Sequence, residues 1–177
     1  MGFGEGTACD IGWMSPLNAD QRKRFQEPQV IRRIIAQPGT VAVVGLSSNP
    51  QKASYFVADY LQKRGWKIIP VTPKSGTILG EPSFASLEDV PVPIDLVDVF
   101  RPPSEMPALV EQAIRIRARA FWMQLKLAHL DAAETAAAAG LLVVADKCIK
   151  MEYARYNGGL NSSGMNSGVI SSKKNKA

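Results

Sequence analysis

Five short apolar runs alternate with segments of helical periodicity along this chain, and this alternation restricts the fold more than any other feature. The runs are rich in β-branched residues, which is typical of strands that are buried on both faces. They cover residues 41–46, 67–72, 95–100, 120–125 and 141–146. Because helices between consecutive strands make right-handed crossovers, the strands should be parallel. The sequence therefore predicts an α/β fold, a Rossmann-like doubly wound parallel sheet of about five strands in a single domain.

The domain organisation follows from where this pattern begins and ends. A chain of 177 residues suits one domain. We expect the Rossmann-like domain to span residues 28–156 and to begin with a helix at Pro28. Residues 1–27 are expected to form an N-terminal extension, flexible or loosely docked, and residues 157–177 a basic tail rich in Gly, Asn and Ser. Between residues 76 and 93 the pattern weakens to a short extended piece and a capped helical turn.

Composition excludes several classes of protein and site. The sequence has no run of roughly 18 apolar residues, so no membrane span is expected. The chain has one histidine, His129, and two distant cysteines, Cys9 and Cys148, which form neither a zinc pattern nor a disulfide framework. A reducing, cytoplasmic setting is the simplest interpretation of this cysteine usage.

The net charge of +5 arises mostly at the end of the chain. Residues 161–177 contribute Lys173, Lys174 and Lys176 with no acid, while the rest of the chain is nearly neutral. Because the excess does not form a basic stripe across the predicted fold, the charge argues against a nucleic-acid partner.

Each expected strand end carries a basic residue. In a doubly wound sheet the carboxyl ends of the strands share one edge, and ligands bind there near the point where the strand order reverses. The five basic residues are Lys52, Lys74, Arg101, Lys126 and Lys147. Their shared edge favours an anionic, phosphate-rich ligand. Solvated loop lysines without a ligand are the alternative interpretation.

The first strand is followed by a glycine and then by a helix. The backbone N–H groups at the start of such a helix favour binding of a phosphate. It is not the dinucleotide fingerprint, because Ser47 and Pro50 stand where the second and third glycines would be. This loop offers hydroxyl groups instead, and many strand-to-helix turns look similar.

The end of the second strand is more discriminating. A site for NAD places Asp or Glu there to bind the ribose diol. Here the residues are Thr72, Pro73 and Lys74. A cation in place of the acid argues against NAD and favours a ribose that carries a phosphate, as in NADP or coenzyme A.

The chain resembles the small stand-alone CoA-binding proteins of the YccU type, which are similar to the CoA-binding domain of succinyl-CoA synthetase alpha subunits. The resemblance covers roughly residues 28–172. It is carried together by the segments VAVVGLSSNPQKASYFVADYLQKRGWKIIPVTP, ILGEPSFASLEDVP, DLVDVFRPPSE, FWMQL, GLLVVADKCIKMEYAR and GMNSGVISSKK.

This resemblance implies a set of residues that bind coenzyme A or acyl-CoA. The residues around the CoA phosphates would be Gly45, Ser47, Asn49, Lys52 and Ser54. Those that hold the adenosine ribose and its 3′-phosphate would be Val71, Thr72, Pro73 and Lys74. Those that border the ligand or its pantetheine arm would be Phe100, Arg101, Trp122 and Gln124. Cys148 and Glu152 would lie at the far side of the cleft.

Two residues depart from the family pattern. Members of the family often carry Arg where Lys52 stands, and Lys lacks the bidentate fork of Arg. They commonly have Gly after the Gln-Leu pair of the fourth strand, where this chain has Lys126. A side chain there would crowd the ligand or add a phosphate contact.

No complete catalytic constellation is visible, and His129 is expected to be a surface or helix-capping residue. Cys148 is either a small buried apolar residue or a thiol that forms a mixed disulfide with CoA, with Lys147 and Lys150 lowering its pKa.

The favoured function is a CoA-binding carrier, sensor or regulatory module. An NADP-dependent reductase and an acyl-CoA ligase subunit are the alternatives. The partner would be the CoA ligand, with a homodimer or a partner enzyme left open.

Overall fold

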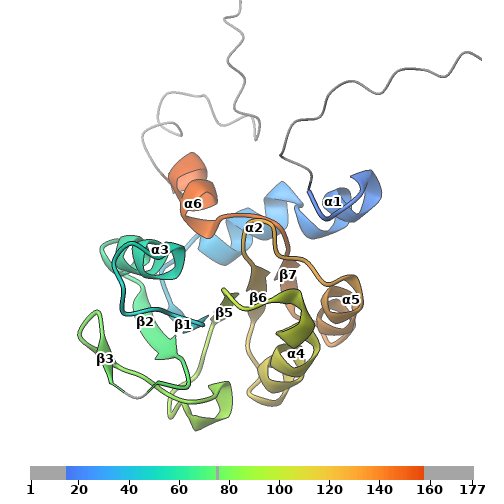
Figure 1. Cartoon of the computed structure of the whole chain (residues 1–177). Helices are drawn as coiled ribbons and strands as arrows, with labels where there is room; N and C mark the ends of the chain where they lie inside the picture. Colours follow the sequence, from blue (N-terminus) through green and yellow to red (C-terminus); the bar gives the residue numbers. More distant parts are fainter. Residues whose placement is uncertain (1–14, 75, 158–177) are drawn as a thin grey trace, which may run out of the picture.

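The computed structural model describes residues 15–74 and 76–157, and it contains the expected parallel sheet (Figure 1). Five strands form the sheet in the order β2-β1-β5-β6-β7. Their bounds are β1 Thr40–Val44, β2 Lys67–Val71, β5 Leu96–Val99, β6 Ala120–Met123 and β7 Leu142–Val144. All neighbouring strands pair in parallel. The predicted α/β fold and its five strands are confirmed.

Helices cover both faces of this sheet, as the continuous apolar runs require. On one face lie α4 (Met106–Arg115), α5 (Leu130–Ala138) and Phe25 of α1 (Ala19–Phe25). On the other face lie α2 (Pro28–Ile35), α3 (Ala53–Gln62) and α6 (Ile149–Asn157). Figure 1 shows α4 and α5 on the side of the sheet away from α3 and α6. These two sides are called the α4 face and the α3 face below.

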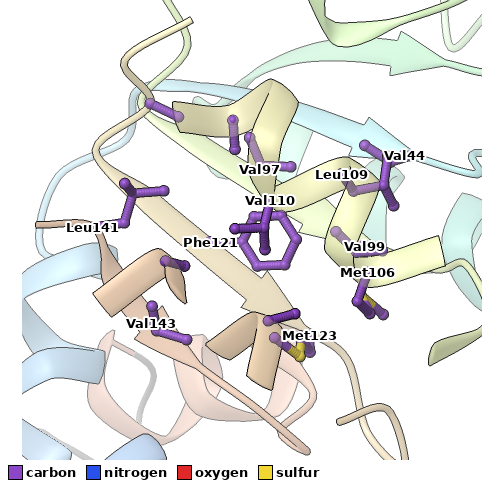
Figure 2. Packing of buried hydrophobic residues seen from close by; sticks show 14 of the residues in the cluster. Val44, Val97, Val99, Met106, Leu109, Val110, Phe121, Met123, Leu141 and Val143 are labelled. Carbon is purple, nitrogen blue, oxygen red and sulfur yellow. The ribbon is translucent and has the colours of Figure 1, made fainter. Parts of the chain in front are cut away.

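Alternate residues of each strand pack into the two cores. Figure 2 shows the core of the α4 face, where Val97 of β5 and Phe121 of β6 meet Val110 of α4. Leu96 and Trp122, one residue away in each strand, belong to the core of the α3 face. The central strands therefore have no solvated face, and their only open positions are at their ends.

The weakly patterned segment between residues 76 and 93 has the structure that the sequence predicts. It forms a short antiparallel hairpin of β3 (Thr77–Ile78) and β4 (Glu81–Pro82). A 3-10 turn over Leu87–Asp89 follows, capped by Ser86. Phe84 exchanges backbone hydrogen bonds with the end of β2, so this segment shields the outer edge of the sheet.

Two helices were absent from the sequence prediction. Helix α1 lies within the expected extension of residues 1–27, and its Phe25 is only 2% exposed. The backbone N–H of Ala145 donates to the Phe25 carbonyl, so this part of the extension packs against the end of β7. Helix α6 follows β7 directly and buries Ile149 and Tyr156. Helix α1 is short and mostly polar, and the apolar residues of the short helix α6 do not gather on one face, so periodicity alone does not reveal either helix.

Residues 1–14, 75 and 158–177 lie outside the described part, and the predictions for Cys9 and for the lysine-rich tail fall there. Within the described part, no helix has the length and apolar character needed to cross a membrane.

Candidate functional site

The strand order places a topological switch point between β1 and β5. From β1 the chain passes through α3 to β2 on one side, and the later strands are added on the other side. Ligands of open α/β sheets bind beyond the carboxyl ends of the strands at such a point. A cleft of about 230 Å³ lies there, between the ends of β1, β2 and β5 and the first turns of α4. Five of the predicted site residues line it: Gly45, Val71, Thr72, Pro73 and Arg101.

Gly45 determines how closely the loops at the switch point approach. Its φ angle is +85°, a conformation that favours glycine. A Cβ atom at this position would lie 2.8 Å from Cδ of Arg101 and 3.2 Å from the carbonyl oxygen of Phe100. The Gly45 N–H donates to the Val71 carbonyl at 2.8 Å. The loop after β1 therefore lies directly against the loop after β5 and the end of β2.

The polar side chains of the loop after β1 form hydrogen bonds with backbone N–H groups of the same loop. The Ser54 hydroxyl accepts the Ser47 N–H, the Ser47 hydroxyl accepts the Asn49 N–H, and Asn49 Oδ1 accepts the Gln51 N–H, all at 2.9–3.1 Å. These side chains fix the shape of the loop that leads into α3. No side chain among the described residues caps the N-terminus of α3, whose N-cap is Lys52. The partial positive charge at this end of α3 favours an anion.

Lys52 and Lys74 are both exposed. Among residues 15–74 and 76–157, neither ammonium group has an acidic side chain within ion-pairing distance. Arg101 and Lys147 differ, because Arg101 pairs with Glu105, and Lys147 lies 3.6 Å from Glu152. Four of the five basic residues predicted at this edge thus divide into two lysines without an acidic partner and two cations that already face an acid.

Trp122 and Gln124 do not reach the cleft, contrary to the prediction. Trp122 is 0% exposed, and its Nε1 donates to the Lys147 carbonyl at 2.6 Å. Gln124 is 4% exposed and donates its Nε2 to Oδ1 of Asp98 at 2.7 Å. Trp122 belongs to the core of the α3 face, and Gln124 points the same way because side chains two residues apart along a strand share a face. Phe100 is half-buried and packs against the same core.

Asp98 was not among the predicted site residues, although the sequence shows a charge within the apolar run DLVDVF. The side chain is 0% exposed, and its Oδ2 has no hydrogen-bond partner within the described residues. Burial raises the pKa of this carboxyl from 3.8 to about 7, and the hydrogen bond from Gln124 acts in the opposite direction. Asp98, Trp122 and Gln124 are called the interior cluster below.

Cys148 is half-buried beside the core of the α3 face. Burial raises the pKa of its thiol, and the charge of Lys150 opposes this only weakly. The Lys150 ammonium lies 3.5 Å from the centre of the Phe56 ring, and Lys147 faces Glu152. Of the two interpretations of Cys148, its burial and the direction of its pKa favour the small buried residue over the activated thiol. Glu152 is also structural, since it is buried and accepts hydrogen bonds from Arg155.

His129 fulfils the expectation of a helix-capping role. It is the N-cap of α5, and its Nδ1 accepts the backbone N–H of Ala132 at 3.2 Å. No group of three or more His, Cys, Asp or Glu side chains within the described residues is arranged to hold a metal ion.

Comparisons with known proteins agree with this architecture. The family described as a CoA binding domain matches residues 39–154. The uncharacterized protein YneT of Bacillus subtilis is 36% identical over 124 residues, which cover 70% of this chain and 92% of that protein. An ADP-forming acetate–CoA ligase of Methanocaldococcus jannaschii is 31% identical over 80 residues, which are 45% of this chain and 11% of the ligase.

A solved structure of a hypothetical protein from Pyrococcus horikoshii OT3 has a TM-score of 0.71 at 34% identity, covering 74% of this chain and 92% of that chain. The family match extends from the start of β1 into α6 and includes both loops of the switch point. This chain belongs to the CoA binding domain family, as the sequence resemblance implied.

Proposed function

We propose that this protein binds coenzyme A or acyl-CoA at the cleft between the carboxyl ends of β1, β2 and β5. The observation that carries the proposal is the combination of an unpaired Lys74 after β2 with a glycine-bounded phosphate loop after β1. A dinucleotide site for NAD would need a carboxylate where this chain has Thr72, Pro73 and Lys74. Membership of the CoA binding domain family supports the same ligand.

Each end of the ligand has a matching part of the site. The diphosphate would lie against the loop from Gly45 to Lys52 and the uncapped amides of α3. The ribose and its 3′-phosphate would lie beside Thr72 and Lys74. Ligand pockets that enclose a drug-sized molecule measure roughly 300–1,000 Å³, so a cleft of 230 Å³ would hold only part of CoA. The remainder would lie across the exposed loops.

The proposed role is that of a carrier, sensor or regulatory module without a catalytic step of its own. The similarity to part of an acetate–CoA ligase favours a second candidate, a ligase subunit that acts with a separate catalytic chain. Co-purification with a larger protein would favour the ligase subunit, whereas a stable homodimer alone would favour the binding module.

Calorimetric titration of the purified protein with CoA and with NADPH tests the ligand directly. We expect heat from CoA and none from NADPH. Tight binding of NADPH without binding of CoA would overturn the proposal and favour a reductase that uses the same phosphate-accepting edge.

The Lys74→Ala variant tests the position of the 3′-phosphate. We expect it to weaken CoA binding by about 1.5–3 kcal/mol, the value of one charge-assisted contact, and to leave binding of 3′-dephospho-CoA nearly unchanged. Lys67→Ala is the matched control, because Lys67 is an exposed lysine at the opposite end of β2. Equal weakening of both ligands by Lys74→Ala would show that Lys74 does not bind the 3′-phosphate.

A further inference from the structure

Arg101 and Glu105 form a bidentate ion pair at the switch point. Arg101 donates its Nε to Oε2 of Glu105 at 2.8 Å and its Nη2 to Oε1 at 2.6 Å. Both side chains line the cleft, and each is 41% exposed. They are the charged side chains that line the cleft within the described part of the chain. While the pair is intact, the lining of the cleft therefore has no net charge.

The backbone holds both partners in place. Glu105 ends the 3-10 turn Pro103–Glu105, and its N–H donates to the Pro102 carbonyl at 3.0 Å. Two consecutive prolines limit the φ angles of this turn. The aliphatic part of Arg101 lies over Gly45, where there is no side chain to displace it. The guanidinium is thus fixed beside the loop that would receive the phosphates.

The Glu105 carboxylate makes with Arg101 the same contact that a phosphate would make. Guanidinium groups bind carboxylates and phosphates through the same planar fork. The hydrogen bond from Arg101 lowers the pKa of Glu105, so this residue is charged at neutral pH. An anion that enters the cleft must displace this carboxylate and also meets its repulsion.

We propose that Glu105 is a specificity-determining residue of the cleft, which occupies Arg101 until a phosphate group displaces it. This inference rests on the proposed binding of CoA. An intramolecular carboxylate has a high effective concentration, so a free monocarboxylate competes with it poorly. A diphosphate brings more charge and further contacts to the loop after β1. Glu105 therefore selects phosphate-bearing ligands over small carboxylates and lowers the affinity for both.

The Glu105→Gln variant tests this role by calorimetry with CoA and with acetate as the carboxylate probe. We expect CoA to bind about three- to ten-fold more tightly to the variant than to the wild-type protein. Acetate should compete with CoA measurably in the variant and not in the wild type. In an Arg101→Gln background the same substitution should give a clearly smaller gain, because only the repulsion by Glu105 is removed and no guanidinium is left to release.

Glu134→Gln is the matched control. It removes one negative charge from a second ion pair, between Glu134 and Arg24, which does not line the cleft. This control should leave CoA affinity within two-fold of the wild type. A similar gain in the control, or a gain from Glu105→Gln that is undiminished in the Arg101→Gln background, would overturn the proposed role of Glu105.

The experiment also separates this inference from the proposed function. If the wild-type protein binds CoA and Glu105→Gln binds it equally or more weakly, the inference fails and the proposed function stands. If neither protein binds CoA, the proposed function fails and the inference fails with it.

Discussion

The carboxyl edge of the sheet contains two polar regions, and the sequence predicted residues from both of them for a single ligand site. The cleft, lined by Gly45, Thr72 and Arg101, opens toward the α4 face and is bounded by exposed loops. The interior cluster of Asp98, Trp122 and Gln124 lies toward the α3 face and is at most 4% exposed. Both regions consist of residues at or near strand ends. Their difference shows that a position at this edge does not by itself make a side chain accessible, because the packing of the helices decides access.

Truncation of the aromatic side chain in the interior cluster should lower the free energy of unfolding more than substitutions in the cleft. Trp122→Ala removes a fully buried indole, which we expect to lower the free energy of unfolding by about 3–5 kcal/mol. Trp122→Phe retains most of the volume and loses only the hydrogen bond to the Lys147 carbonyl. Chemical denaturation should therefore show a smaller loss for Trp122→Phe, with unchanged affinity for CoA. A folded Trp122→Phe variant that no longer binds CoA would show that Trp122 belongs to the ligand site and not to a separate interior cluster.

Gly45 belongs to the cleft, and its replacement should affect both stability and binding. We expect Gly45→Ala to destabilise the fold by about 2–4 kcal/mol, because a positive φ and a close contact with Arg101 both oppose a side chain. Gly140→Ala is the control, since its φ is +89° and no atom lies within 4 Å of the added Cβ. The control should lose about 1–2 kcal/mol through strain alone and retain binding. Equal effects in thermal unfolding and calorimetry would show that the contact with Arg101 is unimportant.

The buried Asp98 should make the stability of the fold depend on pH, which distinguishes the interior cluster from the cleft. Its carboxyl holds a proton up to about pH 7 in the folded chain but loses it near pH 3.8 in the unfolded chain. The unfolded chain therefore binds fewer protons between these values, and the contribution of Asp98 to stability falls as pH rises from about 4 to 7.

The Asp98→Asn variant removes this dependence. We expect it to be more stable than the wild type by about 1–3 kcal/mol at pH 8 and to lose that advantage near pH 4. The gain is limited because the new amide N–H replaces Oδ2, which has no partner. Asp95→Asn is the control, as the half-buried Asp95 already accepts the Thr40 N–H through Oδ2. A stability difference that does not change with pH would contradict the protonated state of Asp98.

Much of the fold could be predicted from local pattern. The strands and the turn capped by Ser86 follow from alternation, β-branched residues and capping chemistry. Helices α1 and α6 could not be predicted in this way. Both helices are short, and they are stabilised by docking onto surfaces that other elements supply, such as the core that receives Tyr156.

The candidate site was predicted only in part, and the reason is again tertiary. Gly45, Thr72, Pro73 and Arg101 lie together because parallel strands end at one edge. The spacing of Arg101 and Glu105 was visible in the sequence, but their pairing depends on a turn that local propensity does not specify. The raised pKa of Asp98 depends on complete burial, which follows from its neighbours in β1 and β6.

Local sequence alone specifies the parallel sheet, the edge where its loops gather and the absence of an acid after the second strand. These depend on residue type and order along the chain. Only the tertiary structure decided which strand-end residues are accessible, which cations are already neutralised and which carboxyl is sealed from water. Exposure and charge at a given residue are set by groups distant in sequence, and the packing of the helices on the two faces of the sheet brings those groups together.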